Sequence, residues 1–419
     1  MTHARARRAA TATSQAAVAG ASSAVRTPLW AAALALVAAS SLARADGAAP
    51  DPALGDTQIL GPSIPRLQIE WMAFRVTAYN QYGSGYQSKS GPILGPGSER
   101  LTVFEPQAEI VATQGDRLTH RIWVPIDVLS AASPNSIPKI ADVVSGASRH
   151  NVGGTLQWST AYKVDPTTQL STTTGLHIEE PFRSWNGGIG ASRALADQNT
   201  VIAGSVAGVF DWFDHFLTNG ARTGRTERSS TLGSVGITQV ISPGTVANIN
   251  YGLTVQEGEL GNTWNAVPLV TGVRGPEILP SQRVRHALVG RLAQFLPWNG
   301  ALRLYYRFYG DDWGIVAHSA EGQLMQRLTP TLYVGGIYRF HTQTGPPFFT
   351  TRAQDSGELR VADSDLAPLD SHTFGGKVVG DVPGAGLARS LHYEFEYDRY
   401  VRTNDLRIDI VTCSVGLRF

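Results

Sequence analysis

The sequence predicts an all-β fold: a transmembrane, outer-membrane β-barrel of about sixteen antiparallel strands, within a range of fourteen to eighteen. From residue 67 to the C-terminus, apolar and polar residues alternate in one segment after another, as in strands with one apolar face. The connections between these segments are short and long in turn. Only 16% of the residues are charged, yet the mean hydropathy is −0.10, as expected where apolar and polar faces alternate.

The N-terminal segment predicts a signal peptide, residues 1–45. Arg26 precedes an apolar core at about residues 29–42, which is too short to span a membrane, and the tripeptide ARA that ends at Ala45 forms an A-x-A cleavage site. The mature chain is therefore expected to be exported. The next segment, residues 46–66, is rich in Ala, Gly and Pro and predicts a flexible periplasmic leader.

The barrel is assigned to residues 67–419, in which turn residues separate sixteen candidate strands. The segment RLYYRFYG is typical, because Leu304, Tyr306 and Phe308 occupy every second position. The predicted strands are about residues 67–79, 101–113, 117–129, 153–164, 169–179, 187–196, 200–212, 231–241, 245–256, 283–296, 301–310, 315–328, 331–342, 372–382, 387–398 and 405–419.

Short and long connections alternate along the chain, according to whether the preceding strand has an even or an odd number. Short connections such as TQGD, DPTT and PWNG follow the even-numbered strands, whereas most connections after odd-numbered strands are long. Short periplasmic turns and long extracellular loops are typical of an outer-membrane barrel, and an even strand count places both termini at the periplasmic end. The long connections are predicted at residues 80–100, 130–152, 213–230, 257–282 and 343–371.

A soluble secreted β-sandwich or solenoid would also contain alternating strands. Three features favour the barrel: loop lengths sorted by parity, aromatic residues near strand ends, and charged residues on the polar faces, which a sandwich core would not tolerate unpaired. We interpret the tryptophans of FDWFDHF (210–216) and YGDDWG (309–314) as girdle aromatics beside loop carboxylates.

If the apolar face points to lipid, the other face lines a lumen, and sixteen strands usually enclose an aqueous channel. Two interpretations of its charges remain open. Opposed basic and acidic walls could select ions, or paired charges could brace the inside of a wide barrel. The candidate pore-lining residues are Arg121, Asp127, Arg285, Arg291, Arg303, Arg307, Glu321, Arg327, Arg339, His392, Glu394 and Glu396.

Motifs for metals, cofactors or catalysis are scarce. Asp363, Asp365 and Asp370 in DSDLAPLD are a calcium candidate, but they lack EF-hand spacing, so a solvated acidic loop is favoured. The single cysteine rules out a cysteine metal cluster, no cofactor is expected, and a net charge of +1 gives no reason for nucleic-acid binding. A non-enzymatic role is predicted; a lipid-face hydrolase, using His286 or His318 with an unidentified serine, is a distant third hypothesis.

The C-terminal strand ends in the alternating sequence TCSVGLRF. In a closed barrel this strand pairs on both sides, and its terminal Phe419 is a candidate signal for the barrel-assembly machinery. Arg407 and Asp409 share the outward parity of Phe419. Either this part of the strand lies above the bilayer, or a bulge resets its register.

Several stretches resemble one known family. They are DVVSGAS (142–148), RSWNGGIG (183–190), NYGLTVQEGELGNTWNAVPL (250–269), residues 279–321, YRFHTQTGPPFF (338–349) and DSDLAPLDSHTFGGKV (363–378). The family is an uncharacterised group of Gram-negative exported proteins called domain of unknown function 3570. The resemblance implies an outer-membrane protein and supplies no catalytic residues.

These observations predict a passive channel for small polar or anionic solutes. The alternative is a plugged barrel that acts as a binding or assembly protein through its long extracellular loops. Outer-membrane lipid, the barrel-assembly machinery and small polar solutes are the expected partners.

Overall fold

The computed structural model describes residues 67–83, 87–88, 91–92, 101–130, 151–216, 221–261, 266–384, 386 and 388–419. The predicted signal peptide and leader lie outside these ranges, as does most of the predicted loop 130–152. Within the described residues the named elements are all strands, and none forms a helix with the length and hydropathy of a membrane span.

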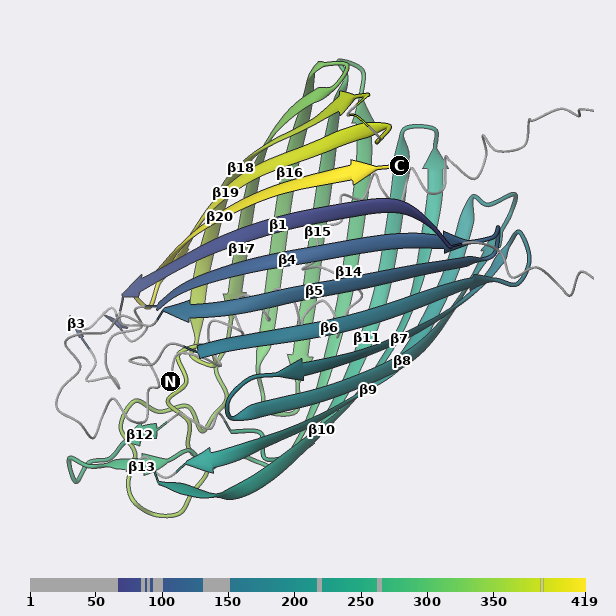
Figure 1. Ribbon diagram of the computed structural model, residues 1–419. Coiled ribbons are helices and arrows are strands. Elements are labelled where there is room, and N and C mark those ends of the chain that lie inside the picture. The colour runs from purple at the N-terminus through teal and green to yellow at the C-terminus, as the bar shows by residue number, and fades with distance from the viewer. Residues whose placement is uncertain are drawn as a thin grey trace, which may run out of the picture.

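Sixteen antiparallel strands form a closed barrel, which confirms the predicted fold class (Figure 1). The first strand, β1 (Leu67–Gly83), pairs with the last, β20 (Leu406–Arg418), and this pairing closes the sheet. The other barrel strands are β4 (Leu101–Gln114), β5 (Leu118–Ser130), β6 (Asn151–Lys163), β7 (Thr168–Ile178), β8 (Phe182–Leu195), β9 (Thr200–Phe216), β10 (Arg222–Ser242), β11 (Thr245–Gly258), β14 (Gln282–Leu296), β15 (Gly300–Asp311), β16 (Val316–Thr329), β17 (Leu332–Gln343), β18 (Leu369–Pro383) and β19 (Ser390–Arg402). Two small hairpins complete the elements: β2 (Gln87–Ser88) with β3 (Gly91–Pro92), and β12 (Ala266–Pro268) with β13 (Arg274–Pro276).

The short connections meet at one end of the barrel, which also carries the C-terminus, and the β12–β13 hairpin lies at the opposite end (Figure 1). The turn between β6 and β7 shows how so short a connection can reverse the chain. The Asp165 carboxylate accepts hydrogen bonds from the backbone N–H groups of Thr167 (2.8 Å) and Thr168 (2.9 Å). These bonds, with one from the Thr167 hydroxyl, lower the pKa of Asp165 to about 2 and shape the turn within four residues.

One predicted long loop is wrong. The segment 213–230 is mostly strand, because β9 continues to Phe216 and β10 begins at Arg222. The sequence ARTGRTERSS, residues 221–230, lacks apolar alternation, and most of its first half is exposed. The start of β10 is exposed on both faces and needs no apolar face, so its sequence carries no period-two signal.

The outside of the barrel is apolar around its whole circumference. Every barrel strand exposes at least one large apolar side chain, and Ile189 reaches 68% exposure. A soluble monomer does not expose a continuous apolar belt, whereas the hydrocarbon core of a bilayer requires one. The chain is therefore built as a membrane-spanning barrel. One belt residue per strand, from β1 to β20, is Phe74, Phe104, Ile122, Leu156, Leu176, Ile189, Val206, Val235, Ile249, Leu288, Leu304, Leu324, Tyr338, Phe374, Phe395 and Val415.

At the loop end of β1, β4 and β20 the polarity of the two faces is reversed, with apolar side chains inside and charged side chains outside. Inside, Tyr79, Leu101 and Leu406 belong to a buried apolar cluster. Outside, the Asp409 carboxylate accepts hydrogen bonds from Arg399 at 2.7 and 2.8 Å. The ladders on both sides of β20 run without a register shift, so the bulge alternative is wrong. This part of β20 lies beyond the apolar belt, where water replaces lipid outside and packed side chains fill the inside.

Two long segments at the loop end pack together as a unit that we call the cap: residues 259–281, of which 262–265 are outside the described range, and residues 344–368. Isolated bridges join them, including a parallel bridge from Leu269 to Ala353. The cap therefore consists of segments that are distant in sequence and held by backbone pairing.

The cap has its own apolar core. Leu260, Trp313, Ile315, Val361 and Leu366 form one buried cluster. The predicted role of the YGDDWG tryptophan as a girdle aromatic is wrong, because Trp313 is 5% exposed and its indole N–H donates to the Gln282 carbonyl. An indole needs such a partner when it is buried.

Candidate functional site

All twelve charged residues that the sequence assigns to a lumen lie on inward faces, opposite in parity to the apolar belt. They are Arg121 and Asp127 on β5, Arg285 and Arg291 on β14, Arg303 and Arg307 on β15, Glu321 and Arg327 on β16, Arg339 on β17, and His392, Glu394 and Glu396 on β19. Their roles in a pore remain a prediction.

Six of the arginines occupy four adjacent strands, β14 to β17, and we call them the arginine strip: Arg285, Arg291, Arg303, Arg307, Arg327 and Arg339. An aromatic ring packs against two guanidinium groups of the arginine strip. The guanidinium of Arg291 lies 5.6 Å from the ring centroid of Tyr305, and that of Arg339 lies 5.8 Å from the same ring. Stacking on an aromatic face restricts the arginine side chains without cancelling their charge.

Neutral amides position two members of the arginine strip. Arg303 donates to the Gln323 side-chain oxygen at 3.0 Å, and Arg291 donates to that of Asn248 at 3.1 Å. Such bonds orient a guanidinium through a neutral acceptor. Seven arginines and two acids, Asp311 and Glu321, face inward on β14 to β17, once Arg283 is counted with the strip.

The two acids of these strands are held by arginines. The Asp311 side chain is fully buried and pairs with Arg283. The Arg283 guanidinium also lies 4.2 Å from the Trp313 ring centroid, next to the cap. Glu321 is 3.9 Å from Arg339 on the next strand. The paired acids therefore brace the wall, and the arginines still outnumber them.

The acids of β19 form a separate paired cluster. Lys377 on β18 lies 2.8 Å from Glu394 and 3.5 Å from Glu396, and the side chains of all three are less than a tenth exposed. Arg75 on β1 lies 4.0 Å from Glu394. This geometry is the bracing network that the sequence left open as one interpretation. Lys377 was absent from the candidate residues, although it lies at the inward parity of its predicted strand.

The acids of β19 do not form a wall opposite the arginine strip, so the interpretation of opposed walls is wrong for these residues. Around the barrel, β19 is separated from β17 by β18 alone, so the acids of β19 neighbour the arginine strip. The strands across the barrel from β14 to β17 are β4 to β7. Their inward faces carry three acids, Glu105, Glu109 and Asp127, and two cations, Arg121 and Lys163, among neutral residues, and Arg121 pairs with Glu109 between β4 and β5.

A stretch of wall with small residues leaves room inside. The inward positions of β6 to β9 are mainly Ser, Thr, Gly and Ala, and Ala203 and Ser205 of β9 are exposed although they face inward. Small side chains on one wall and long arginines on another produce a lumen whose arginine strip lies to one side.

The cap reaches into the mouth of the barrel. Gln343, inward at the end of β17, donates to the carbonyls of Asp365 and Ala367, each at 2.8 Å. Arg402, inward at the end of β19, bonds to the Asp365 carboxylate at 2.6 Å. Segment 363–367 of the cap is thus tied to the inner wall, across the loop end of the arginine strip.

We expect Arg402→Gln to loosen the cap. Removal of one partner leaves the Asp365 carboxylate without its counter-charge, so cap segment 363–367 should be cleaved by protease about tenfold faster in the reconstituted barrel. The matched control is Arg407→Gln, an exposed arginine outside the same end. Equal cleavage rates for the two variants would show that the ion pair does not hold the cap.

The lipid-face hydrolase hypothesis required a serine bonded to His286 or His318. Each histidine instead bonds a tyrosine through Nδ1: Tyr251 and Tyr306, respectively, both at 2.7 Å. The geometry needed for a lipid-face nucleophile is therefore missing at these two histidines.

A serine–histidine contact that the sequence did not suggest lies inside the barrel. Ser319 Oγ is 2.9 Å from His341 Nδ1, and His341 Nε2 is 3.1 Å from the side-chain oxygen of Gln343. Ser319 is only 3% exposed, so its hydroxyl is not open to a solute. The contact aligns Gln343 with the cap. Only the register, in which Ser319 faces His341, brings the residues together.

The three candidate calcium ligands do not converge. Asp365 is bonded to Arg402, Asp363 accepts the backbone N–H of Asp365, and Asp370 is exposed on β18. The favoured solvated acidic loop is also wrong, because Asp363 is only 1% exposed. Over the described ranges no group of three metal-ligating side chains occurs.

The chain terminus is held in place. The backbone N–H of Phe419 donates to the Glu70 carbonyl at 3.1 Å, one step beyond the ladder that joins β20 to β1. The final aromatic residue thus lies at the short-turn end, where the sequence places it.

Comparison with known proteins gives a family resemblance and a low similarity to solved structures. No curated protein matches the chain. A BenF-like porin from Pseudomonas fluorescens Pf-5 is 9% identical, with a TM-score of 0.43, over 84% of this chain and 99% of the porin. OccK9 (OpdG) of Pseudomonas aeruginosa is 10% identical, with a TM-score of 0.42, over 84% and 98% of the two chains. A bacterial polysaccharide outer membrane secretin is 6% identical, with a TM-score of 0.41, over 83% and 98%.

These values assign no function to this chain. The family model described as protein of unknown function DUF3570 matches residues 213–407, from the end of β9 to the start of β20. Over this range the chain resembles a family of unknown function, as the sequence motifs indicated.

Proposed function

We propose that this protein is a passive outer-membrane channel for small polar solutes with a preference for anions. The observation that supports the proposal is the excess of seven inward arginines over two acids on β14 to β17. A ring or strip of one charge sign inside a pore raises the local concentration of the opposite ion.

The arginines would act as a series of weak sites. A carboxylate or phosphate exchanges part of its water shell for the forked N–H donors of a guanidinium. Gln323 and Asn248 orient two of these guanidinium groups through neutral side-chain oxygens. Several similar sites in succession allow a solute to leave each one as easily as it enters.

Orientation and targeting belong to the same proposal. A signal peptide cleaved after Ala45 would deliver the chain to the periplasm, with the short-turn end inward and the cap outward. Outer-membrane lipid would surround the apolar belt, and the barrel-assembly machinery would recognise β20 with its terminal Phe419.

A second candidate function is ligand binding by the cap. The observation that favours it is the contact of cap segment 363–367 with inward Gln343 and Arg402, which narrows access to the arginine strip. A barrel closed in this way would hold a ligand at its outer mouth in place of passing it.

Planar-bilayer recording distinguishes the two functions. Purified protein should produce discrete conductance steps in potassium chloride, with a reversal potential in a salt gradient that indicates chloride preference. A folded barrel, verified by heat-modifiable gel migration, that gives no steps would exclude the channel and leave the binding function.

A further inference from the structure

Three tyrosine–histidine pairs recur on the outward face of six neighbouring barrel strands, which are β11 and β14 to β18. They are Tyr251 with His286, Tyr306 with His318, and Tyr338 with His372. The tyrosine oxygen to histidine Nδ1 distances are 2.7, 2.7 and 2.9 Å, and the ring centroids are 6.2, 6.2 and 6.1 Å apart. The repeated geometry shows that these are one feature of the surface.

The register explains the repetition. The ladder partners of His286, His318 and His372 on the tyrosine-bearing strands are Leu253, Phe308 and Phe340. Each tyrosine stands two residues before that partner, so every histidine lies nearer the loop end than its tyrosine. The histidines occur on every second strand and are staggered by two residues, which puts them about 12 Å apart if strands are spaced at about 4.8 Å. They form a row along the upper edge of the apolar belt.

The row presents hydrogen-bond donors to its surroundings in the tautomer in which each tyrosine hydroxyl donates to histidine Nδ1. A tyrosine hydroxyl that donates to Nδ1 leaves the proton of a neutral imidazole on Nε2. Within the described part of the chain, no hydrogen bond to Nε2 of His286, His318 or His372 is found. A donor at the boundary of a bilayer needs an acceptor, and lipid phosphate oxygens lie at that depth.

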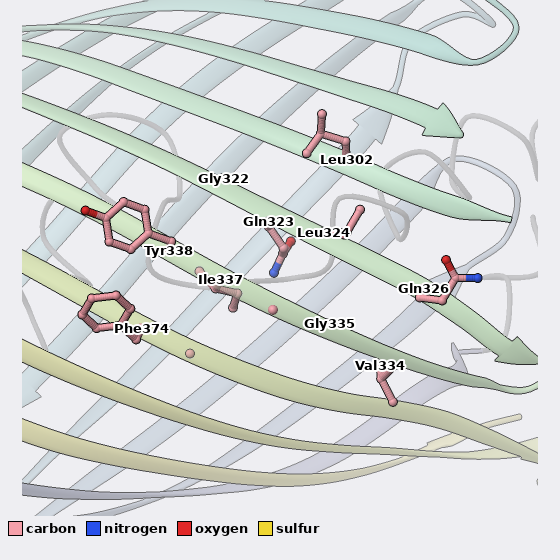
Figure 2. A pocket seen from close by; sticks show the side chains of 12 residues that line it. Leu302, Gly322, Gln323, Leu324, Gln326, Val334, Gly335, Ile337, Tyr338 and Phe374 are labelled. Carbon is pink, nitrogen blue, oxygen red and sulfur yellow. The ribbon is translucent and has the colours of Figure 1, made fainter. Parts of the chain in front are cut away.

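Below the row the apolar surface is hollowed. A shallow groove of about 610 Å³ has Gly322 and Gly336 at its floor and Leu324, Tyr338 and Phe374 along its sides. Figure 2 shows Tyr338 and Phe374 beside each other at one end of the groove and Leu302 and Leu324 farther along it. Tyr338 belongs to both features, because its ring lines the groove and its hydroxyl bonds to His372.

A second groove, of about 580 Å³, continues from the first on the same face. Gly290, Leu304, Tyr306 and Phe340 line it, and Tyr338 borders both grooves. Tyr306 is likewise a member of a tyrosine–histidine pair. An elongated apolar chain can therefore lie in either groove with its polar end at a histidine.

Two carboxylates lie on the water side of the histidine row. Asp370 precedes His372 by two residues on β18, or about 7 Å along the strand. Asp312 accepts the backbone N–H of Val284, which is two residues from His286 on β14. A head group with an ammonium beyond its phosphate would meet an opposite charge there.

We propose that this face binds a phospholipid of the leaflet around the cap end, whose head group carries a phosphate and, beyond it, an ammonium. The acyl chains lie in the two grooves, the phosphate accepts hydrogen bonds from the histidine Nε2 groups, and the ammonium approaches Asp312 and Asp370. The inference rests on the membrane-spanning barrel and does not depend on the channel.

The test uses the full barrel in detergent, with dimyristoyl phosphatidylethanolamine as probe and bound lipid counted by native mass spectrometry. Gly336→Leu fills the groove, and a Cβ at this position meets no atom within 4 Å, so the strand should fold normally. The matched control is Gly233→Leu on the outward face of β10, where a Cβ also meets nothing within 4 Å. Gly336→Leu should weaken lipid retention about tenfold and Gly233→Leu should not.

The head-group contacts are tested separately. The triple variant His286→Phe, His318→Phe, His372→Phe keeps the rings and removes the donors, and should also weaken retention about tenfold. His120→Phe, an outward histidine at the start of β5, is its control. Asp312→Asn with Asp370→Asn should abolish the preference for phosphatidylethanolamine over phosphatidylglycerol.

Each result has one meaning. Wild-type retention in both Gly336→Leu and the triple histidine variant would overturn the proposal, as would a wild-type barrel that keeps no lipid or one that prefers phosphatidylglycerol. Conductance recorded on the same preparations separates the two functions, because every substituted side chain points away from the lumen. Lost lipid with unchanged conductance supports the lipid site, whatever the barrel transports.

Discussion

Replacing Arg303 and Arg307 together by glutamate should turn a chloride-preferring barrel towards cations. The inward charges of β14 to β17 are now seven arginines and two acids, a balance of +5, and the double variant has five arginines and four acids, a balance of +1. The ratio of chloride to potassium permeability should fall about tenfold, which corresponds to about 1.4 kcal/mol in relative ion energy. The reversal potential in a salt gradient measures it.

The matched control moves the same charges to the other face. Arg183 and Arg193 are exposed on the outward side of β8, so Arg183→Glu with Arg193→Glu changes the net charge equally without entering the lumen. The charge-preserving variant Arg303→Lys with Arg307→Lys should keep the wild-type sign of selectivity. A reversal potential that moves equally for the inward and outward glutamate pairs would contradict the role of the arginine strip.

Lys377→Met should be among the most destabilising single substitutions in the barrel wall. It would leave Glu394 and Glu396 beside each other, less than a tenth exposed, without their shared cation. Breaking a buried pair by removal of one partner costs about 3 kcal/mol or more. Urea unfolding in lipid vesicles, followed by tryptophan fluorescence, should show a free energy of unfolding lower by that amount.

Two further variants isolate the cause. Lys163→Met removes a lysine at the exposed end of β6 and should leave the free energy of unfolding within about 0.5 kcal/mol of the wild-type value. Combining Lys377→Met with Glu394→Gln and Glu396→Gln removes the unpaired charges and should recover most of the loss. If Lys377→Met unfolds at the same urea concentration as Lys163→Met, the cluster does not brace the wall.

The strands could be predicted because a bilayer imposes a rule on each of them. With lipid outside and water inside, every second residue must be apolar, and the sixteen predicted strands match the sixteen barrel strands. The rule fails where the bilayer ends. The extension of β10 back to Arg222 has water on both faces, so its residues show no alternation and were assigned to a loop.

The inward placement of the charged residues followed from the same rule, but their partners did not. Parity identifies Glu394 and Glu396 as inward, whereas only the ladder between β18 and β19 sets Lys377 between them. The position of the β19 acids beside the arginine strip has a simpler origin. Strands of this barrel follow chain order, so counting positions around the circumference would have put β19 near β17.

The packing of the cap could not be predicted from the alternation of residues. Its core brings Leu260, Trp313 and Val361 together, and these residues come from three separate connections. The link from Arg402 to Asp365 crosses 37 residues of sequence and joins a strand to a segment without regular structure. The three tyrosine–histidine pairs were equally hidden, because each depends on strand register.

By itself the sequence determined that this chain forms a closed barrel, which face of each strand meets lipid, and where the turns lie. These properties are local, because the polarity of each residue depends on whether lipid or water lies on its own side of the sheet. Only the tertiary structure decided which charges pair, how the cap enters the mouth, and how histidines align above grooves in the apolar belt. Those arrangements depend on register and on contacts between distant segments, which no periodic pattern records.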